Sequence, residues 1–328
     1  MMRISFIGGG SFGSALARSV SLTGNEVIVY DRKEAIVDEI NNLHTNHKYL
    51  KDMEFPDNVT ATNNLEEAVS NMDIVVYSVP SSAVREMSEK IKGYLKGTEI
   101  IVSIAKGVDP KSLEPLSQVI EEVLGIEPVI LSGPSHAEEV AKDLPTTLVA
   151  ASKNEIAMKK VQEAFASNTL RVYWNNDLKG VEIGGAVKNI IALAAGISDG
   201  IGYGDNSKAA LMTRGMAEII RIGEKMGADR ETFYGLTGMG DLIVTCTSMH
   251  SRNRRCGILI GQGKTMEEAV EEVGMVVEGI KATKSFHDIA KKLNVEMPIT
   301  EAVHSVLFMD VPPKDAVNSL MMRELKKE

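Results

Sequence analysis

The pattern of hydrophobic and polar residues changes near residue 177. Up to residue 176, short apolar runs alternate with segments of helical period. Several runs, such as 74–77 and 100–102, are apolar without alternation, as is typical of strands covered on both faces. The predicted strands lie at 3–7, 26–30, 73–79, 99–104, 129–131, 146–151 and 170–174, and the predicted helices at 12–22, 34–42, 81–95 and 112–124. This alternation predicts a doubly wound α/β fold with a mostly parallel sheet.

Beyond residue 177 the strand-like runs stop, and long segments of helical period follow. These segments lie at 181–197, 208–226, 265–273, 280–293 and 298–308. Glycine-rich interruptions at 200–204 and 235–240 indicate turns, or backbone that a ligand approaches closely. We therefore expect two domains, residues 1–177 and residues 178–328, of which the second is all-α.

The amino-acid composition limits which partners and which kinds of site we expect for this protein. The 328 residues include 36 Lys and Arg against 45 Asp and Glu, a formal net charge of −9. This acidic balance disfavours nucleic acid and anionic membrane surfaces as partners, because both require a cationic surface. The two cysteines, Cys246 and Cys256, match neither a disulfide framework nor a zinc site. We expect no bound metal.

No segment has the pattern of a signal peptide or of a membrane helix. The first predicted strand follows only two residues, which leaves no room for a signal-peptide apolar region. The longest apolar stretch, 184–197, is interrupted by Lys188 and Asn189 and falls short of the roughly 20 residues that span a bilayer. We expect a cytoplasmic protein without integral membrane contact.

A glycine motif follows the first predicted strand. Gly8, Gly10 and Gly13 form the pattern G-x-G-x-x-G between that strand and a predicted helix. The first glycine permits a tight turn, the second lets a diphosphate approach the backbone, and the third lets the helix pack on the strand. The helix N-terminus supplies N–H donors and a positive dipole end. The motif predicts a dinucleotide site, although three glycines alone are also compatible with a simple turn.

The end of the second predicted strand bears on the choice of dinucleotide. Asp31 follows this strand, and Arg32 and Lys33 come next. An acid here favours NAD by accepting from the ribose 2′-hydroxyl, whereas basic groups favour the 2′-phosphate of NADP. Arg32 and Lys33 are also compatible with solvated residues of the following helix. The choice between NAD and NADP stays open.

One lysine and one asparagine lie inside the most apolar segment, 184–196. Burial disfavours the charged form of a lysine such as Lys188 and lowers its pKa toward working pH, which is the condition for a general acid/base. The alternative is a lysine that reaches solvent from a partly exposed face. Asn189 lies beside it.

A second group of polar residues lies between 238 and 255. Asp241, beside two glycines, is suited to accept from a substrate hydroxyl, to orient Lys188, or to cap a helix. Arg252, Arg254 and Arg255 supply local positive charge, and the planar guanidinium suits phosphate. The alternative for the arginines, above all Arg254 and Arg255, is a solvated basic helix.

Two further patterns point to loops. His44 and His47 have the spacing of two ligands but lack a third, so a polar loop or a helix end is favoured. The segment 132–136 lacks the G-x-S-x-G pattern of a nucleophile elbow, so we expect a strand-to-helix loop with backbone donors.

The ordered motifs resemble the bacterial NAD(P)-dependent sn-glycerol-3-phosphate dehydrogenase family over essentially the whole chain. The resemblance rests on segments 8–17, 44–50, 103–107, 131–140, 181–196, 238–242, 245–248 and 251–253. It implies a Rossmann domain at 1–177 that binds NAD(P)H. It also implies an α-helical substrate-binding and catalytic domain at 178–328, of the 6-phosphogluconate dehydrogenase C-terminal type. We expect a homodimer, although the sequence does not fix the oligomeric state.

The resemblance also implies roles for single residues. Lys188 becomes the proton donor and acceptor on the substrate oxygen, and Lys106 lies at the junction of substrate and coenzyme. The implied substrate-binding residues are Lys106, Gly133, Ser135, Lys188, Asn189, Asp241, Ser251, Arg252 and Asn253. The glycine motif and the resemblance together predict as coenzyme-binding residues Gly8, Gly10, Ser11, Phe12, Gly13, Asp31, Arg32, Tyr49, Lys106, Ala137, Arg252, Val276 and Glu278.

The chain departs from the family pattern at three positions. Phe12 replaces the common Trp, Asp31 occupies a position that is usually not acidic, and His136 stands where an aromatic residue is common. Asp31 matters most, since a carboxylate there tilts the preference towards NAD.

The reaction implied by the resemblance is reversible hydride transfer between NAD(P)H and dihydroxyacetone phosphate. Its product, sn-glycerol 3-phosphate, would serve glycerophospholipid biosynthesis. Two alternatives stay open: a related 3-hydroxyacid dehydrogenase, and a non-catalytic module that senses NAD(P). For the phosphorylated substrate we expect Lys106, Lys188 and Arg252 to converge on one cleft of an otherwise acidic protein.

Overall fold

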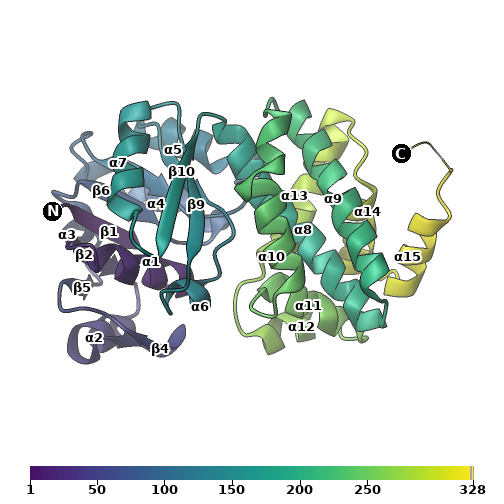
Figure 1. Ribbon diagram of the computed structural model, residues 1–328, viewed down its shortest axis with the longest axis horizontal. Helices are drawn as coiled ribbons and strands as arrows, with labels where there is room; N and C mark the ends of the chain where they lie inside the picture. Colours follow the sequence, from purple (N-terminus) through teal and green to yellow (C-terminus); the bar gives the residue numbers. More distant parts are fainter. Residues whose placement is uncertain (326, 328) are drawn as a thin grey trace. The chain divides into compact units, whose positions relative to one another are not determined.

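A sheet of eight strands forms the centre of the first of two units, residues 1–182 (Figure 1). The computed structural model describes residues 1–325 and 327. Across the sheet the strand order is β10-β9-β8-β7-β6-β1-β2-β5. The strands are β1 (Arg3–Ile7), β2 (Glu26–Tyr30), β5 (Val59–Thr62), β6 (Ile74–Tyr77), β7 (Ile100–Ser103), β8 (Val129–Ser132), β9 (Thr146–Ala151) and β10 (Leu170–Asn175). All neighbouring pairs are parallel except β8 with β9, so the predicted mostly parallel sheet is confirmed.

Helices cover both faces of this sheet. They are α1 (Ser11–Ser21), α2 (Glu34–Leu43), α3 (Leu65–Val69), α4 (Val84–Ile91), α5 (Leu116–Leu124), α6 (Ala137–Val140) and α7 (Glu155–Phe165), and 3₁₀ turns η1 (Ser81–Ala83) and η2 (Lys92–Tyr94) flank α4. Successive side chains of a strand point to opposite faces. In β6, Ile74 and Val76 join one buried cluster, whereas Val75 and Tyr77 join the other. Both faces are therefore apolar, which explains the runs without alternation.

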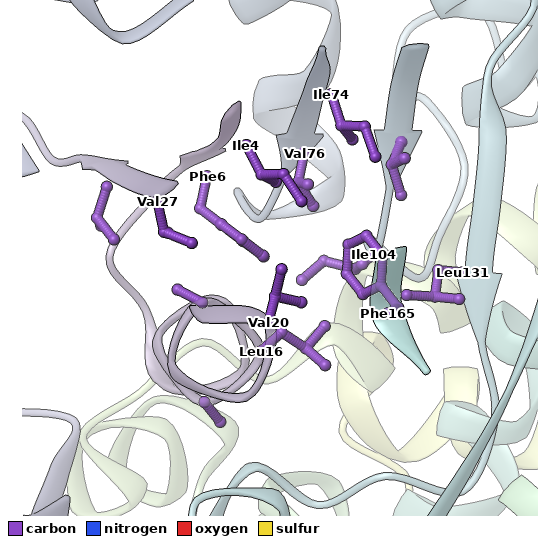
Figure 2. Close-up of a cluster of buried hydrophobic side chains, with 14 of the residues drawn as sticks. Ile4, Phe6, Leu16, Val20, Val27, Ile74, Val76, Ile104, Leu131 and Phe165 are labelled. Carbon is purple, nitrogen blue, oxygen red and sulfur yellow. The ribbon is translucent and has the colours of Figure 1, made fainter. Parts of the chain in front are cut away.

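Helix α1 packs across the larger of these two clusters. Figure 2 shows Leu16 and Val20 of α1 facing Ile4 and Phe6 of β1. The ring of Phe165, at the end of α7, lies 6.3 Å from the ring of Phe6. This packing fixes the start of α1 directly beyond the end of β1, where the glycine motif lies.

The first unit also contains strands that the hydrophobic pattern does not predict. Strand β5 forms one edge of the main sheet, and β3 (Thr45–Asn46) pairs with β4 (Leu50–Glu54) as a separate antiparallel hairpin. The hairpin escapes a search for apolar runs because β4 reads Leu-Lys-Asp-Met-Glu and buries only Leu50 and Met53. Leu50 and Met53 join the larger buried cluster, and polar contacts also hold the hairpin beside the glycine motif.

The second unit, residues 183–328, consists of helices, and no strand occurs among its described residues. The predicted all-α second half is therefore confirmed. Its helices are α8 (Leu178–Ile201), which starts in the first unit, α9 (Asp205–Lys225), α10 (Asp241–Thr247), α11 (Arg252–Gly261), α12 (Met266–Val273), α13 (Glu278–Leu293), α14 (Pro298–Phe308) and α15 (Pro313–Met321). A 3₁₀ turn, η3 (Arg230–Tyr234), and a π-helical turn, η4 (Leu236–Gly240), precede α10. The expected domain boundary at 177 lies just before α8, whereas the compact units separate within α8, after Glu182.

Helices α8 and α11 touch through their backbones. Gly196 and Gly200 of α8 face Gly257 and Gly261 of α11. A Cβ on Gly257 would lie 2.2 Å from the carbonyl oxygen of Leu193, so no larger residue fits there without moving a helix. This contact fixes the first turn of α11 relative to the middle of α8.

Helix α8 is long and apolar enough to cross a membrane, and it is the one such helix among the described residues. With 24 residues it extends beyond the apolar stretch 184–197, which by itself falls short of a span. Its most apolar window is completely buried within the protein. Central helices of globular domains meet the same criteria, and α8 is a core helix of this kind.

Candidate functional site

The glycine motif forms a tight turn between β1 and α1. Gly8 has φ +118°, and a Cβ there would lie 2.8 Å from the carbonyl oxygen of Ser78. A Cβ on Gly13 would lie 2.6 Å from Ser78 Oγ, whereas a Cβ on Gly10 would meet no atom within 4 Å. Gly8 and Gly13 are thus required by packing, and Gly10 borders open space. These are the roles that the motif predicts for a dinucleotide-binding turn.

The N-terminus of α1 is free to bind an anion. No side chain caps it, and its first turn contains no acidic residue. The first N–H groups of a helix have no partner within the helix and lie at the positive end of its dipole. Together with the open space at Gly10, this end of α1 fits the diphosphate of a dinucleotide coenzyme.

Other predicted residues follow neighbouring strands at the same edge of the sheet. Asp31 follows β2, Lys106 lies beyond β7, and Gly133 follows β8, and these strands run parallel to β1. The strand order reverses between β1 and β6, because the chain adds β2 on one side of β1 and β6 on the other. Ligands of doubly wound sheets bind outside the carboxyl ends of the strands at such a reversal.

The Asp31 carboxylate is held by backbone N–H groups. Oδ2 accepts from the N–H of Gly9 at 3.2 Å, and Oδ1 accepts from the N–H of Lys33 at 2.9 Å. Arg32 and Lys33 are exposed. Asp31 therefore supports the glycine turn as well as marking the end of β2.

Lys106, Gly133 and Ser135 lie together in the first unit. Lys106 Nζ donates to the carbonyl oxygen of Gly133 at 3.0 Å, and Ser135 Oγ donates to the same oxygen at 3.1 Å. Gly133 has φ +144°, and a Cβ there would lie 2.9 Å from the carbonyl oxygen of Thr147. The segment 132–136 connects β8 to α6, so the expected strand-to-helix loop is confirmed.

The remaining coenzyme candidates of the first unit lie on or near α1. Ser11 Oγ donates to the carbonyl oxygen of Tyr49 at 3.4 Å, and Phe12 and Tyr49 are half-buried. Ala137 is buried at the start of α6, which packs against α1.

The two histidines near the hairpin lie at a helix end and in the turn between β3 and β4. His44 ends α2 with φ +55°, and His47 Nδ1 lies 2.8 Å from Glu39 Oε1. The favoured interpretation, a helix end and a polar loop, is confirmed.

Lys188 is the centre of a buried polar cluster in the second unit. The residue is only 5% exposed, so it does not extend to solvent. Its Nζ donates to Asp241 Oδ1 at 3.0 Å and to Thr245 Oγ1 at 2.6 Å. The carboxylate stabilises the ammonium and thereby opposes the effect of burial, which favours neutral lysine. The ion pair with Asp241 therefore allows an ionisable amine to be buried in the protein.

Asp241 forms an ion pair with Lys188 from the start of α10. It is the first residue of that helix, directly after the N-cap residue Gly240, and it is 2% exposed. The π-helical turn η4 ends directly before it, and such turns occur frequently at functional sites.

Thr245 belongs to the same cluster, although the sequence analysis assigned it no role of its own. Its Oγ1 accepts from Lys188 and donates to the carbonyl oxygen of Asp241 at 2.6 Å. Thr245 follows Asp241 by four residues, so both lie on one face of α10. The spacing of four residues from Asp241 is the feature of the sequence that could have identified Thr245.

Asn189 and Asn253 connect three helices. Asn253 Nδ2 donates to Asn189 Oδ1 at 2.9 Å, and Asn253 Oδ1 accepts from the N–H of Gly279 at 2.8 Å. These bonds join α8, α11 and the first turn of α13. Glu278, the first residue of α13, and the exposed Val276 lie next to this junction in sequence.

Ser251 and the arginines of α11 differ in their environments. Ser251 is buried and caps α11, since its Oγ accepts from the N–H of Arg254 at 3.2 Å. The Arg252 guanidinium is partly exposed and has no hydrogen bond or ion pair within residues 1–325 and 327. Arg254, in contrast, forms an ion pair with Asp199 at 2.7 Å and is only 13% exposed at its side chain. The alternative of a solvated surface residue is therefore wrong for Arg254.

Comparison with known proteins assigns the chain to a family. Residues 3–158 match the family model for the N-terminus of NAD-dependent glycerol-3-phosphate dehydrogenase, and residues 177–318 match that for its C-terminus. The chain is 59% identical over 326 residues to a glycerol-3-phosphate dehydrogenase [NAD(P)+] of Clostridium tetani, covering 99% of this chain and 93% of the relative. It is 56% identical to the protein of the same name of Clostridium perfringens, covering 100% of this chain and 99% of the relative.

A solved structure agrees with this assignment. The glycerol-3-phosphate dehydrogenase of Coxiella burnetii is 38% identical, with a TM-score of 0.95 over 98% of this chain and 99% of that one. The identities and coverage extend over both units. The chain therefore belongs to the NAD-dependent glycerol-3-phosphate dehydrogenase family.

Proposed function

We propose that this protein catalyses the reaction dihydroxyacetone phosphate + NAD(P)H + H⁺ ⇌ sn-glycerol 3-phosphate + NAD(P)⁺. The single observation that carries the proposal is the buried Lys188–Asp241 pair in a chain of this family. A buried, oriented amine has one clear use in such a reaction, which is to exchange a proton with the substrate oxygen.

Lys188 is the general acid and base of the proposed reaction. In reduction its ammonium donates a proton to the C2 oxygen of dihydroxyacetone phosphate, and in oxidation the neutral amine takes that proton back. The nicotinamide coenzyme supplies the hydride that adds to C2. Asp241 and Thr245 orient Nζ, and Asp241 stabilises its charged form.

The phosphate of the substrate requires positive charge that the protein does not already neutralise. The Arg252 guanidinium meets this requirement, whereas Arg254 is engaged by Asp199. We assign Arg252 to the phosphate, with Lys106, Gly133, Ser135, Asn189, Asp241, Ser251 and Asn253 as further substrate-binding residues. Arginine suits this task because its planar fork contacts two phosphate oxygens at once.

In the first unit, we assign the coenzyme site to the edge of the sheet at the end of β1. Gly8, Gly10, Ser11, Phe12 and Gly13 form the turn after β1 and the start of α1, and we assign them to the coenzyme diphosphate. We assign Asp31, Arg32, Tyr49, Lys106, Ala137, Arg252, Val276 and Glu278 as further coenzyme-binding residues. Asp31 and Arg32 stand side by side, so NAD and NADP are both accepted.

The proposed cellular setting follows from the reaction. Cytoplasmic sn-glycerol 3-phosphate is a precursor for glycerophospholipids, and a homodimer without nucleic-acid or integral membrane partners is the proposed form. The net charge of −9 supports the absence of nucleic-acid binding.

A comparison of substrates tests the proposal. Purified protein is assayed with NADH and with NADPH against dihydroxyacetone phosphate and against non-phosphorylated 3-oxo acids. We expect turnover with dihydroxyacetone phosphate and none with the 3-oxo acids. Preference for a 3-oxo acid would instead identify a 3-hydroxyacid dehydrogenase. Binding of coenzyme with no turnover of any substrate would identify a sensing module.

A further inference from the structure

The peptide groups around Gly9 are held from both sides. The N–H of Gly9 donates to Asp31 Oδ2 at 3.2 Å, and the preceding carbonyl, of Gly8, accepts from Ser78 Oγ at 2.6 Å. On the other side, the carbonyl of Gly9 accepts from Asn46 Nδ2 at 2.9 Å. Asp31, Ser78 and Asn46, from three separate segments, therefore hold two consecutive peptide groups, and Ser14 Oγ of α1 also donates to the Gly9 carbonyl, at 3.3 Å.

The contact from Asn46 decides where the next N–H points. In a trans peptide the carbonyl and the following N–H point in opposite directions, and the described chain contains no cis peptide bond. Because the Gly9 carbonyl points to Asn46, the N–H of Gly10 points away from Asn46. Gly10 is the glycine of the motif that borders open space. The N–H of Gly10 has no acceptor in the described part of the chain, so it is available to a ligand.

The side-chain amide of Asn46 donates two hydrogen bonds in the protein interior. The residue is fully buried, and its Nδ2 donates to Ser14 Oγ at 3.0 Å in addition to Gly9. Its Oδ1 is buried without a hydrogen-bond partner in the described part of the chain. A rotated amide would place Oδ1 against the Gly9 carbonyl, which pairs two acceptors, so this orientation is fixed. Burying a polar group costs free energy unless it forms hydrogen bonds, and the Asn46 amide forms two, both through Nδ2.

The β3–β4 hairpin presents Asn46 to the glycine turn. Asn46 is the last residue of β3, and its carbonyl accepts from the N–H of Tyr49 at 3.0 Å. Ser11 Oγ of α1 donates to the carbonyl of Tyr49 at 3.4 Å, which is a second contact between the hairpin and the start of α1. The polar hairpin thus has a structural purpose that its sequence pattern does not reveal.

We propose that Asn46 is a positioning residue for the coenzyme: by holding the Gly9 carbonyl, it directs the N–H of Gly10 to the coenzyme diphosphate. The inference rests on the proposed function in one respect, that the chain binds NAD(P)H at the glycine motif. Asn46 acts through the backbone, so its loss weakens coenzyme binding and leaves the chemistry at Lys188 unchanged.

The test is a fluorescence titration of NADH with wild-type protein and with Asn46→Ala. We expect the Kd for NADH to rise about tenfold or more, which corresponds to about 1.4 kcal/mol. At saturating NADH, kcat and the KM for dihydroxyacetone phosphate stay within about twofold of wild type. This split separates coenzyme positioning from a general loss of structure.

Asn58→Ala is the matched control. Asn58 Nδ2 donates to the carbonyls of Ser21 and Asn25, at the opposite end of α1 from the glycine turn. Like Asn46→Ala, this change removes two hydrogen bonds of an amide in the first unit. We expect it to lower the thermal midpoint while leaving the Kd for NADH unchanged.

A second variant covers the case in which Asn46→Ala does not fold. Ser14→Ala removes the hydroxyl that accepts from Asn46 and donates to the Gly9 carbonyl at 3.3 Å. It should raise the Kd for NADH by about threefold. An unchanged Kd in the folded variant, or an equal rise in Asn58→Ala, overturns the role of Asn46. Wild-type protein that binds neither NADH nor NADPH overturns the proposed function instead.

Discussion

Among single residues, the ion-pair partner of a charged side chain determines which role we propose for that side chain. Lys188 and Asp241 are 53 residues apart in sequence and meet at 3.0 Å inside the protein. Removing one charge of such a buried pair leaves the other uncompensated, so the pair acts as a unit. Arg254 is likewise engaged by Asp199. Arg252 keeps its guanidinium available for an anionic ligand.

Arg252→Ala should therefore weaken binding of the phosphorylated substrate. We expect the KM for dihydroxyacetone phosphate to rise by about tenfold or more, since a charge-assisted contact contributes about 1.5–3 kcal/mol. Steady-state kinetics at saturating NADH measure the effect. Arg255→Ala, on the same helix, is the control and should leave KM near the wild-type value. An unchanged KM in Arg252→Ala would place the phosphate contact elsewhere.

The site residues that could be predicted are those with a local signal. Lys188 is marked by its position in an apolar segment, and the glycine motif by its place between a strand and a helix. The ion pair of Arg254 with Asp199 has no local signal, because its partner lies 55 residues away. For the same reason Asn46, which contacts Gly9 from 37 residues away, could not be identified from the pattern.

Among the helices and strands, a backbone contact between two helices positions the residues to which we assign proton exchange and phosphate binding. Helix α8 carries Lys188, and α11 begins beside Ser251 and Arg252, so the glycine contact between α8 and α11 fixes both groups. Apolar runs identified the central strands and the long helices. The apolar runs did not identify the β3–β4 hairpin, because its strands are short and most of their residues are polar.

Gly257→Ala should disrupt the contact between α8 and α11. The added Cβ would lie 2.2 Å from the carbonyl oxygen of Leu193, and backbone atoms cannot move aside singly. We expect a loss of about 1–3 kcal/mol in the free energy of unfolding, measured by urea denaturation. Gly204→Ala is the control, because a Cβ there meets no atom within 4 Å. Equal free energies of unfolding for Gly257→Ala and Gly204→Ala would show that α8 and α11 can move apart without a loss of stability.

At the scale of the whole molecule, two buried carboxyl groups link stability to pH. Burial raises the pKa of Glu182 to about 7 and that of Glu218 to about 7, although each accepts N–H donors that oppose the rise. Glu218 accepts from the N–H groups of Ile299 and Thr300 at the start of α14, and Glu182 from that of Ser117 in α5. Both carboxyls therefore fasten helix N-termini in the interior.

The sign of this linkage follows from the raised pKa values. A carboxyl whose pKa in the folded state exceeds its ordinary value contributes stability below about pH 4.5, and this contribution disappears as pH rises through 7. We expect the free energy of unfolding to fall between pH 5 and pH 8, by on the order of 3 kcal/mol for each group at most. Urea denaturation at a series of pH values measures the slope.

Glu218→Gln should flatten this pH dependence, because the amide does not titrate. Glu271→Gln, at an exposed position, is the control and should keep the wild-type slope. A wild-type protein that becomes more stable from pH 5 to pH 8 would contradict the assignment of a raised pKa to these carboxyls.

The whole fold was more predictable than the site. The change of pattern near residue 177 predicted an α/β unit followed by helices, because each pattern reflects which faces of an element are buried. The antiparallel pairing of β8 with β9 was not predictable, since strand direction depends on how the chain returns to the sheet. The side-chain pairs of the site form only after these elements are packed.

The proposed exchange of the reaction's proton by Lys188 is tested by the kcat of Lys188→Ala with dihydroxyacetone phosphate. The NADH Kd and the thermal midpoint are measured on the same sample, because the change leaves Asp241 without its partner. We expect a loss of kcat of about 10²- to 10⁴-fold, with the Kd for NADH near the wild-type value. A folded variant whose kcat stays within about tenfold of wild type, roughly 1.4 kcal/mol of barrier, would contradict it.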